Sequence, residues 1–165
     1  MHKAGWWLAL AAVIVVLDQL TKHIVAQSFT VGESVAIAPF FNLVYVYNPG
    51  AAFSFLSDQT GWQRWLFVGI ALAASAWIVY LLRRYPHERL FALALALVLA
   101  GAVGNVIDRI CYGAVIDFLD FHAYGRHWPA FNVADTAITC GAVLLVWDAV
   151  RPRRKNESGR MKAEG

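Results

Sequence analysis

The stretch "RLFALALALVLAGAVGNVID" (89–108) decides the fold class, because no ionisable residue lies between its first residue and its last. About 20 apolar residues are needed for a helix to cross the hydrocarbon core of a bilayer. Three other stretches, 5–25, 62–82 and 131–150, have similar length and composition. Backbone groups in lipid must hydrogen-bond within their own segment, so we expect helices. The sequence predicts an all-α integral membrane protein with four transmembrane helices in one domain, 1–150, followed by a basic tail, 151–165.

The composition disfavours a soluble helical bundle. Of the 165 residues, 59% are hydrophobic and only 15% are charged, which is far from the usual balance of soluble domains. The start of the chain has features of a cleavable signal peptide, since Lys3 precedes an apolar run. That run continues past Asp18 to Ile24 without a small-x-small cleavage site, so we interpret 5–25 as a retained span.

The distribution of basic residues predicts the orientation. Lys and Arg occur before the first span, between the second and third, and six times in 151–165, whereas the connection 26–61 has none. By the positive-inside rule, both termini are cytoplasmic, and the loops 26–61 and 109–130 lie on the outer side of the membrane. A basic tail can bind nucleic acid, but a stop-transfer flank beside anionic lipid is the simpler interpretation, so we expect membrane lipid and no nucleic acid as its partner.

Both outer loops predict short β-strands. Residues 29–56 are rich in Val, Phe and Tyr and are interrupted by Gly32, Pro39 and "NPG" (48–50), and apolar and polar residues alternate from Val115 to Phe121. This pattern is typical of strands joined by turns. We expect a small β-rich region on the membrane surface. It is either a structural cap or a region whose free strand edges accept an extended peptide.

Polar side chains gather at the outer end of the predicted helices. Each intramembrane charge costs roughly 2.5–3.5 kcal/mol on the insertion scale, so such a cluster indicates a functional site. The orientation brings to one depth Asp18, Lys22, Asn105, Asp108, Arg109, Asp117, Asn132 and Asp135.

Helical spacing subdivides the cluster. Asn105 lies three residues before Asp108 and four before Arg109, so these side chains share one helix face. Asn132 and Asp135 are also three residues apart, which predicts a shared face on the fourth helix.

Three of the charged groups have plausible structural roles. Asp18 and Lys22 are four residues apart and can pair with each other. Arg109 can neutralise buried charge by pairing with Asp108 or Asp18.

Asp117 and Asp135 differ from these three groups, because neither has a basic residue at helical spacing on its own segment. Two carboxylates in a site of low dielectric constant do not both ionise readily, so one retains a proton. Such a pair can activate water, because the carboxylate accepts the proton of water while the acid protonates a scissile carbonyl oxygen. The alternative is two interfacial Asp residues that are hydrogen-bonded to backbone groups.

Other functions fit the sequence less well. His122 and His127 suggest a metal, but no His-x-x-x-His pattern accompanies them, so we interpret them as loop histidines. An ion-coupled transporter requires acids near the midplane, whereas these acids lie toward one side. A non-catalytic scaffold leaves the two unpaired Asp residues unexplained.

Five motifs in order resemble those of lipoprotein signal peptidase, the bacterial signal peptidase II family. They are "DQLTK" (18–22), "NPGAAFS" (48–54), "GNVIDR" (104–109), "GAVIDFLDF" (113–121) and "FNVADTAI" (131–138). The resemblance covers about residues 5–150.

The resemblance implies an aspartyl endopeptidase of the inner membrane. Such enzymes use no metal or organic cofactor and remove the signal peptide from diacylglyceryl-modified prolipoproteins, cleaving before the lipidated Cys. The family is the target of the antibiotic globomycin. Nothing in the sequence requires more than a monomer.

The resemblance also assigns site residues. Asp117 and Asp135 match the catalytic pair of the family. The residues that match its supporting and substrate-binding positions are Asp18, Asn48, Asn105, Asp108, Arg109 and Asn132. Pro49 biases Asn48 toward extended backbone, which affects the direction of the Asn48 side chain.

Overall fold

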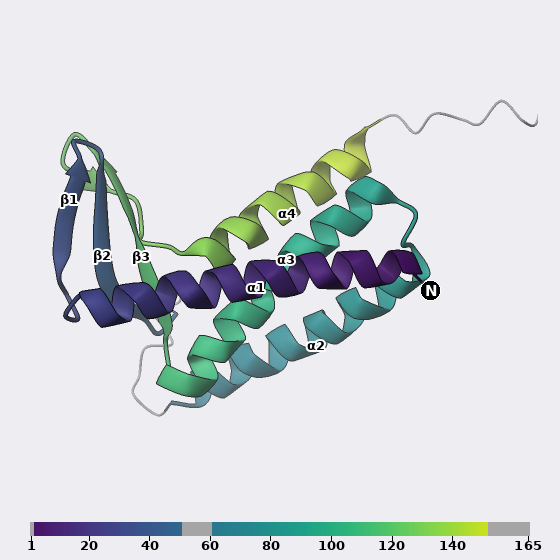
Figure 1. The fold of residues 1–165 in the computed structure, drawn as a ribbon, viewed down its shortest axis with the longest axis horizontal. Helices are drawn as coiled ribbons and strands as arrows, with labels where there is room; N and C mark the ends of the chain where they lie inside the picture. The colour runs from purple at the N-terminus through teal and green to yellow at the C-terminus, as the bar shows by residue number, and fades with distance from the viewer. Residues whose placement is uncertain (1, 51–60, 152–165) are drawn as a thin grey trace, which may run out of the picture.

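The computed structural model describes residues 2–50 and 61–151 and contains four long helices with a small sheet at one end (Figure 1). Each helix is long and apolar enough to cross a bilayer, which confirms the four predicted spans. Three helices extend further than predicted, because the first begins at His2 and ends at Ser28, the second ends at Arg84 and the third ends at Tyr112. The helices are α1 (His2–Ser28), α2 (Trp62–Arg84), α3 (Arg89–Tyr112) and α4 (Val133–Val150).

Helix α3 is the centre of the bundle. In its spanning window 56% of the residues are buried, against 22% in each of the other three helices. Small residues allow α4 to approach α3 closely: a Cβ at Gly101 would overlap the backbone oxygen of Ala134, and one at Gly141 would lie 2.7 Å from the backbone oxygen of Ala94. Close approach at small residues is the usual way in which membrane helices gain van der Waals contact.

The sheet is antiparallel, with the order β1 (Ser34–Ala38), β2 (Phe41–Asn48), β3 (Val115–Ala123) and β4 (Arg126–His127). It confirms the β-rich region predicted in the two loops and lies at the end of the bundle where α1 and α3 end and α4 begins (Figure 1). Buried Tyr45, Ile116 and Phe118 pack against Val25 of α1, which fixes the sheet to the bundle.

Helix α4 begins two residues later than the sequence suggests. Asn132 has an extended backbone (φ −137°) and is the N-cap of α4, and its side chain accepts a hydrogen bond from the backbone N–H of Asp135. The prediction that Asn132 and Asp135 share a helix face is therefore wrong. An N-cap Asn satisfies an N–H that has no partner within the helix, which is why the helix begins after this residue.

Candidate active site

A buried group of three charges joins α1 to α3. Lys22 Nζ lies 2.8 Å from Asp18 Oδ2 and 2.7 Å from Asp108 Oδ2. The predicted pairing of Asp18 with Lys22 is confirmed. The prediction that Arg109 neutralises Asp18 or Asp108 is wrong, because Lys22 reaches both carboxylates.

Each acid of this triad also holds a backbone N–H on another element. Asp18 Oδ1 accepts from Ala134 N over 2.8 Å, and Asp108 Oδ2 accepts from Ile116 N over 3.1 Å. Ala134 precedes Asp135, and Ile116 precedes Asp117. The triad thus fixes the backbone immediately before both Asp residues that the sequence selects as the catalytic pair.

Asp117 lies on β3 with only 1% of its surface exposed. Its Oδ1 accepts from Asn132 Nδ2 over 2.7 Å, and its Oδ2 accepts from Asn48 Nδ2 over 2.9 Å. Burial, together with the charge of Asp135, raises the pKa of Asp117 to about 6, although the hydrogen bonds from Asn48 and Asn132 oppose this shift. Two amides therefore hold a carboxyl group that can carry a proton near neutral pH.

Asp135 lies in the first turn of α4 and is half-buried. Its Oδ1 accepts from Asn105 Nδ2 over 2.8 Å, and its backbone N donates to Asn132 Oδ1 over 2.8 Å. Asn132 consequently contacts both Asp residues, the carboxylate of one and the backbone of the other.

Asn105 connects the triad to this pair. Its Oδ1 accepts from Lys22 Nζ over 3.2 Å, which leaves its Nδ2 free to donate to Asp135. The ammonium of Lys22 thereby fixes which end of the amide faces the carboxylate.

Asn48 and Arg109 complete the set selected from the sequence. The Oδ1 of Asn48 accepts from Gly50 N over 2.9 Å, so the turn after Pro49 directs the Asn48 amide toward Asp117. Arg109 donates to Asn105 O over 3.3 Å, and its guanidinium lies 5.3 Å from the centre of the Phe67 ring. Residues 51–54 of the motif "NPGAAFS" are outside the described part of the chain.

Gln19 is a site residue that the sequence analysis does not select. Its Nε2 donates to Asp108 Oδ1 over 2.9 Å and to Asp18 Oδ2 over 3.2 Å. A long amide inside an apolar span next to an Asp is the signal that identifies it, because a buried amide needs partners.

The described residues, 2–50 and 61–151, contain no group of three His, Cys, Asp or Glu side chains able to hold a metal ion. His122 and His127 stack with ring centroids 4.9 Å apart toward the far end of β3, where His127 Nδ1 lies 2.9 Å from Asp120 Oδ1. They are thus part of the surface of the sheet.

A family model described as "Signal peptidase (SPase) II" matches residues 10–151. The chain belongs to the signal peptidase II family. It is 58% identical over 150 residues to the lipoprotein signal peptidase of Cupriavidus pinatubonensis, a match that covers 91% of this chain and 85% of the relative. The lipoprotein signal peptidase of Ralstonia nicotianae is 56% identical over 154 residues, with 93% of this chain and 89% of the relative covered.

A solved structure confirms the fold. A bacterial membrane enzyme superposes with a TM-score of 0.80 at 32% sequence identity, covering 90% of this chain and 95% of the other. This signal peptidase II family member is therefore a multi-pass peptidase of a bacterial membrane.

Proposed function

We propose that this protein is an aspartyl endopeptidase that removes the signal peptide from diacylglyceryl-modified prolipoproteins, cleaving before the lipidated Cys. Its relatives carry the name lipoprotein signal peptidase. The observation that carries the catalytic assignment is the link through Asn132, which donates to the Asp117 carboxylate and accepts from the backbone of Asp135. In this proposal Asp117 and Asp135 are the catalytic residues.

The reaction requires one proton on the pair of acids. One carboxylate accepts a proton from water as the water oxygen attacks the scissile carbonyl carbon, and the other acid donates its proton to the carbonyl oxygen. In the resulting gem-diol, the nitrogen takes the proton of the protonated acid while one hydroxyl gives its proton to the ionised acid. The C–N bond then breaks and releases the amine and a carboxylic acid. The pair returns to its singly protonated state. Because interacting acids titrate together, the proton belongs to the pair and not to one residue.

The remaining polar residues have supporting roles in this scheme. Asn48, Asn105 and Asn132 donate hydrogen bonds to the two carboxylates, so they orient the oxygens and favour the ionised form. Asp18 and Asp108 hold the backbone before each catalytic Asp. Positioning of this kind determines whether attacking and accepting atoms meet within hydrogen-bond reach.

The position of the pair suits a substrate that is anchored in lipid. Asp117 belongs to β3 and Asp135 to the first turn of α4. These two elements meet where the sheet joins the bundle (Figure 1). A diacylglyceryl group in the outer leaflet would hold the adjacent peptide bond at this depth. Strand β1 is the exposed edge of the sheet, but β2 separates it from Asp117, so we place the scissile segment at the junction and not on that edge.

We further propose an inner-membrane location, with both termini in the cytoplasm and the catalytic pair near the periplasmic face. The lack of Lys and Arg in 26–61 supports this orientation. In this proposal the protein acts as a monomer without a metal or other cofactor, and a globomycin-like inhibitor occupies the catalytic region.

The substrate assignment is tested by incubating purified protein with two forms of one precursor, with and without the diacylglyceryl group on its Cys. We expect cleavage of the modified form only, and mass spectrometry of the product should identify lipidated Cys as its first residue. Equal cleavage of the unmodified form, or cleavage at another bond, would refute the assignment. Globomycin should inhibit the reaction and EDTA should not.

A further inference from the structure

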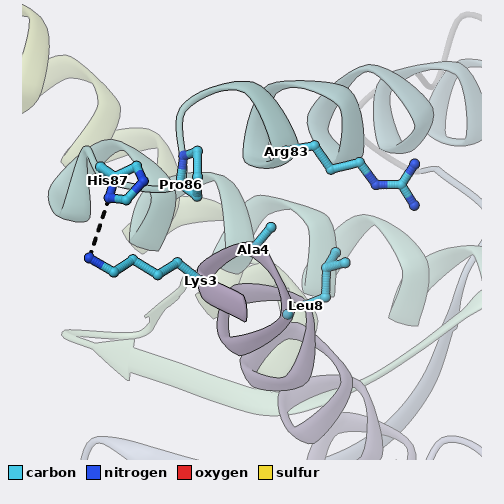
Figure 2. A pocket seen from close by; sticks show the side chains of 7 residues that line it. Lys3, Ala4, Leu8, Arg83, Pro86 and His87 are labelled. Carbon is cyan, nitrogen blue, oxygen red and sulfur yellow. Dashed lines mark hydrogen bonds between the residues drawn. The ribbon is translucent and has the colours of Figure 1, made fainter. Parts of the chain in front are cut away.

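A cavity lies at the end of the bundle opposite the sheet. It has a volume of about 780 Å³ and is formed by the start of α1, the last turn of α2 and the α2–α3 turn (Figure 2). Its walls include Lys3 and Leu8 of α1, Arg83 of α2 and His87 of the turn. The catalytic region described above includes none of these residues.

The cavity is held open by contacts between distant segments. Trp7 Nε1 donates to Pro86 O over 3.1 Å, which fixes the α2–α3 turn against α1. Lys3 Nζ lies 3.3 Å from His87 Nδ1. An ammonium group can only donate, so in this contact His87 offers its unprotonated nitrogen, and two further protons of the ammonium stay available.

The lining combines positive charge with apolar surface. Lys3 and Arg83 are cations, and no Asp or Glu is among the described residues that line the cavity. Figure 2 shows the Lys3 amine on one side of the cavity beside His87 and the Arg83 guanidinium on the other. Leu8, Ala4 and Pro86 supply apolar wall between them.

The depth of the cavity in the membrane determines which ligands can reach it. All four helices can span a bilayer, and the cavity lies at their ends, which is the depth of lipid headgroups. Basic pockets at the ends of transmembrane helices attract the phosphate of anionic lipids. We propose that this cavity binds the headgroup of an anionic phospholipid, with Lys3 contacting its phosphate on one side, Arg83 supplying positive charge on the other side and Leu8 packing against its glycerol region.

Gly5 allows charge and shape to be tested separately. It lines the cavity, and a Cβ added to it would meet no atom within 4 Å. Gly5→Trp therefore fills the cavity without removing a charge. The substitution also replaces a poor helix former, so the helix itself is not weakened.

The test measures lipid binding to the purified full-length protein in neutral detergent, by titration with phosphatidylglycerol, cardiolipin or phosphatidylcholine and native mass spectrometry. The variants are Lys3→Gln, Arg83→Gln and Gly5→Trp. Arg84→Gln is the matched control, because Arg84 is the next residue on the same helix, stacks on Tyr85 at 5.5 Å and does not line the cavity. The tail 152–165 is present in every variant, so its charges contribute equally.

We expect each removed cation to weaken binding of phosphatidylglycerol and cardiolipin about fivefold, which corresponds to about 1 kcal/mol. Gly5→Trp should abolish the specific binding, and Arg84→Gln should leave it unchanged. Arg83→Lys should restore most of it, which separates loss of charge from misfolding. Equal weakening by Arg84→Gln, equal binding of phosphatidylcholine, no effect of Gly5→Trp, or full competition by equimolar inorganic phosphate would overturn the proposal.

Discussion

The side-chain amide of Asn132 donates a hydrogen bond to Asp117 Oδ1 over 2.7 Å. The carbonyl oxygen of the same side chain caps α4 by accepting from Asp135 N over 2.8 Å. A single buried residue therefore caps the start of α4 and orients the Asp117 carboxylate of β3. This relationship couples the folding of the α4 start to the geometry of the proposed catalytic pair.

Asn132→Ala should lower kcat by roughly a hundredfold, because it removes the donor that orients Asp117. It should also lower the free energy of unfolding by about 1 kcal/mol through loss of the helix cap. Cleavage of a lipid-modified precursor and thermal unfolding measure the two effects. Asn42→Ala is the matched control, since Asn42 Nδ2 of β2 donates to Asp120 Oδ2 over 2.8 Å elsewhere on β3. If both variants lost the same activity, the role given to Asn132 would be wrong.

Gly104→Ala should reduce both stability and activity. A Cβ there would lie 2.6 Å from Asp18 Oδ2 and 3.3 Å from Ala134 Cβ, so the substitution forces Asp18 away from the start of α4. Overpacking of this kind costs about 1–3 kcal/mol. Gly69→Ala on α2 is the control, because its Cβ would meet no atom within 4 Å. Circular dichroism during heating and the cleavage rate should separate the two variants, and equal behaviour contradicts the prediction.

Lys22→Met should destabilise the protein by about 3–5 kcal/mol, because it leaves the buried carboxylates of Asp18 and Asp108 without their cation. Adding Asp18→Asn and Asp108→Asn to this variant should recover much of the melting temperature. Activity should stay low, since the amide oxygens accept the backbone N–H groups of Ala134 and Ile116 less strongly than carboxylates do. A melting temperature that is unaffected by Lys22→Met would show that the triad does not support the fold.

The raised pKa of Asp117 predicts a pH dependence with a defined sign. A carboxyl whose pKa rises to about 6 on folding, from 3.8, binds its proton more tightly in the folded state. Its contribution to stability is fully present below about pH 3.8 and is lost as the pH rises through about 6. In Asp117→Asn this component should be missing from the stability measured between pH 4 and 7.

Asp120 should contribute to stability with the opposite pH dependence. Its burial raises the pKa, but hydrogen bonds from His127 and Asn42 outweigh burial, so the pKa of Asp120 is lowered. Asp120→Asn should therefore remove stability that is present above about pH 3.8 and lost at lower pH. The same loss in Asp117→Asn and Asp120→Asn would contradict the assignment of the raised pKa to Asp117.

The sequence predicts the spans, the β-rich loops and the cluster of polar residues, because apolar length and charge placement are local properties. It does not predict which groups pair across helices. Arg109 and Lys22 are equally plausible partners of Asp108 by sequence, and only the packing of α1 against α3 selects Lys22. Gln19 is missed for the same reason. Besides the neighbouring Asp18, its partners are Gly104 O and Asp108 Oδ1 on α3, which lie 85 and 89 residues away along the chain.

Asn132 illustrates a second limit. Its spacing to Asp135 fits both a shared helix face and an N-cap, and the two differ only in the backbone angles of one residue. Helix ends are the least certain part of any assignment from sequence. The consequence is functional here, because the capping position is what allows the amide to reach Asp117.

The most direct test of the catalytic assignment is the rate at which purified Asp117→Asn and Asp135→Asn cleave a diacylglyceryl-modified precursor. Each substitution keeps the shape of the side chain but removes a group that must exchange a proton with water or substrate. We predict folded proteins with cleavage reduced by at least roughly a thousandfold, while Asp120→Asn retains activity. Cleavage at the unsubstituted rate by either variant would contradict the claim that Asp117 and Asp135 together carry out the hydrolysis.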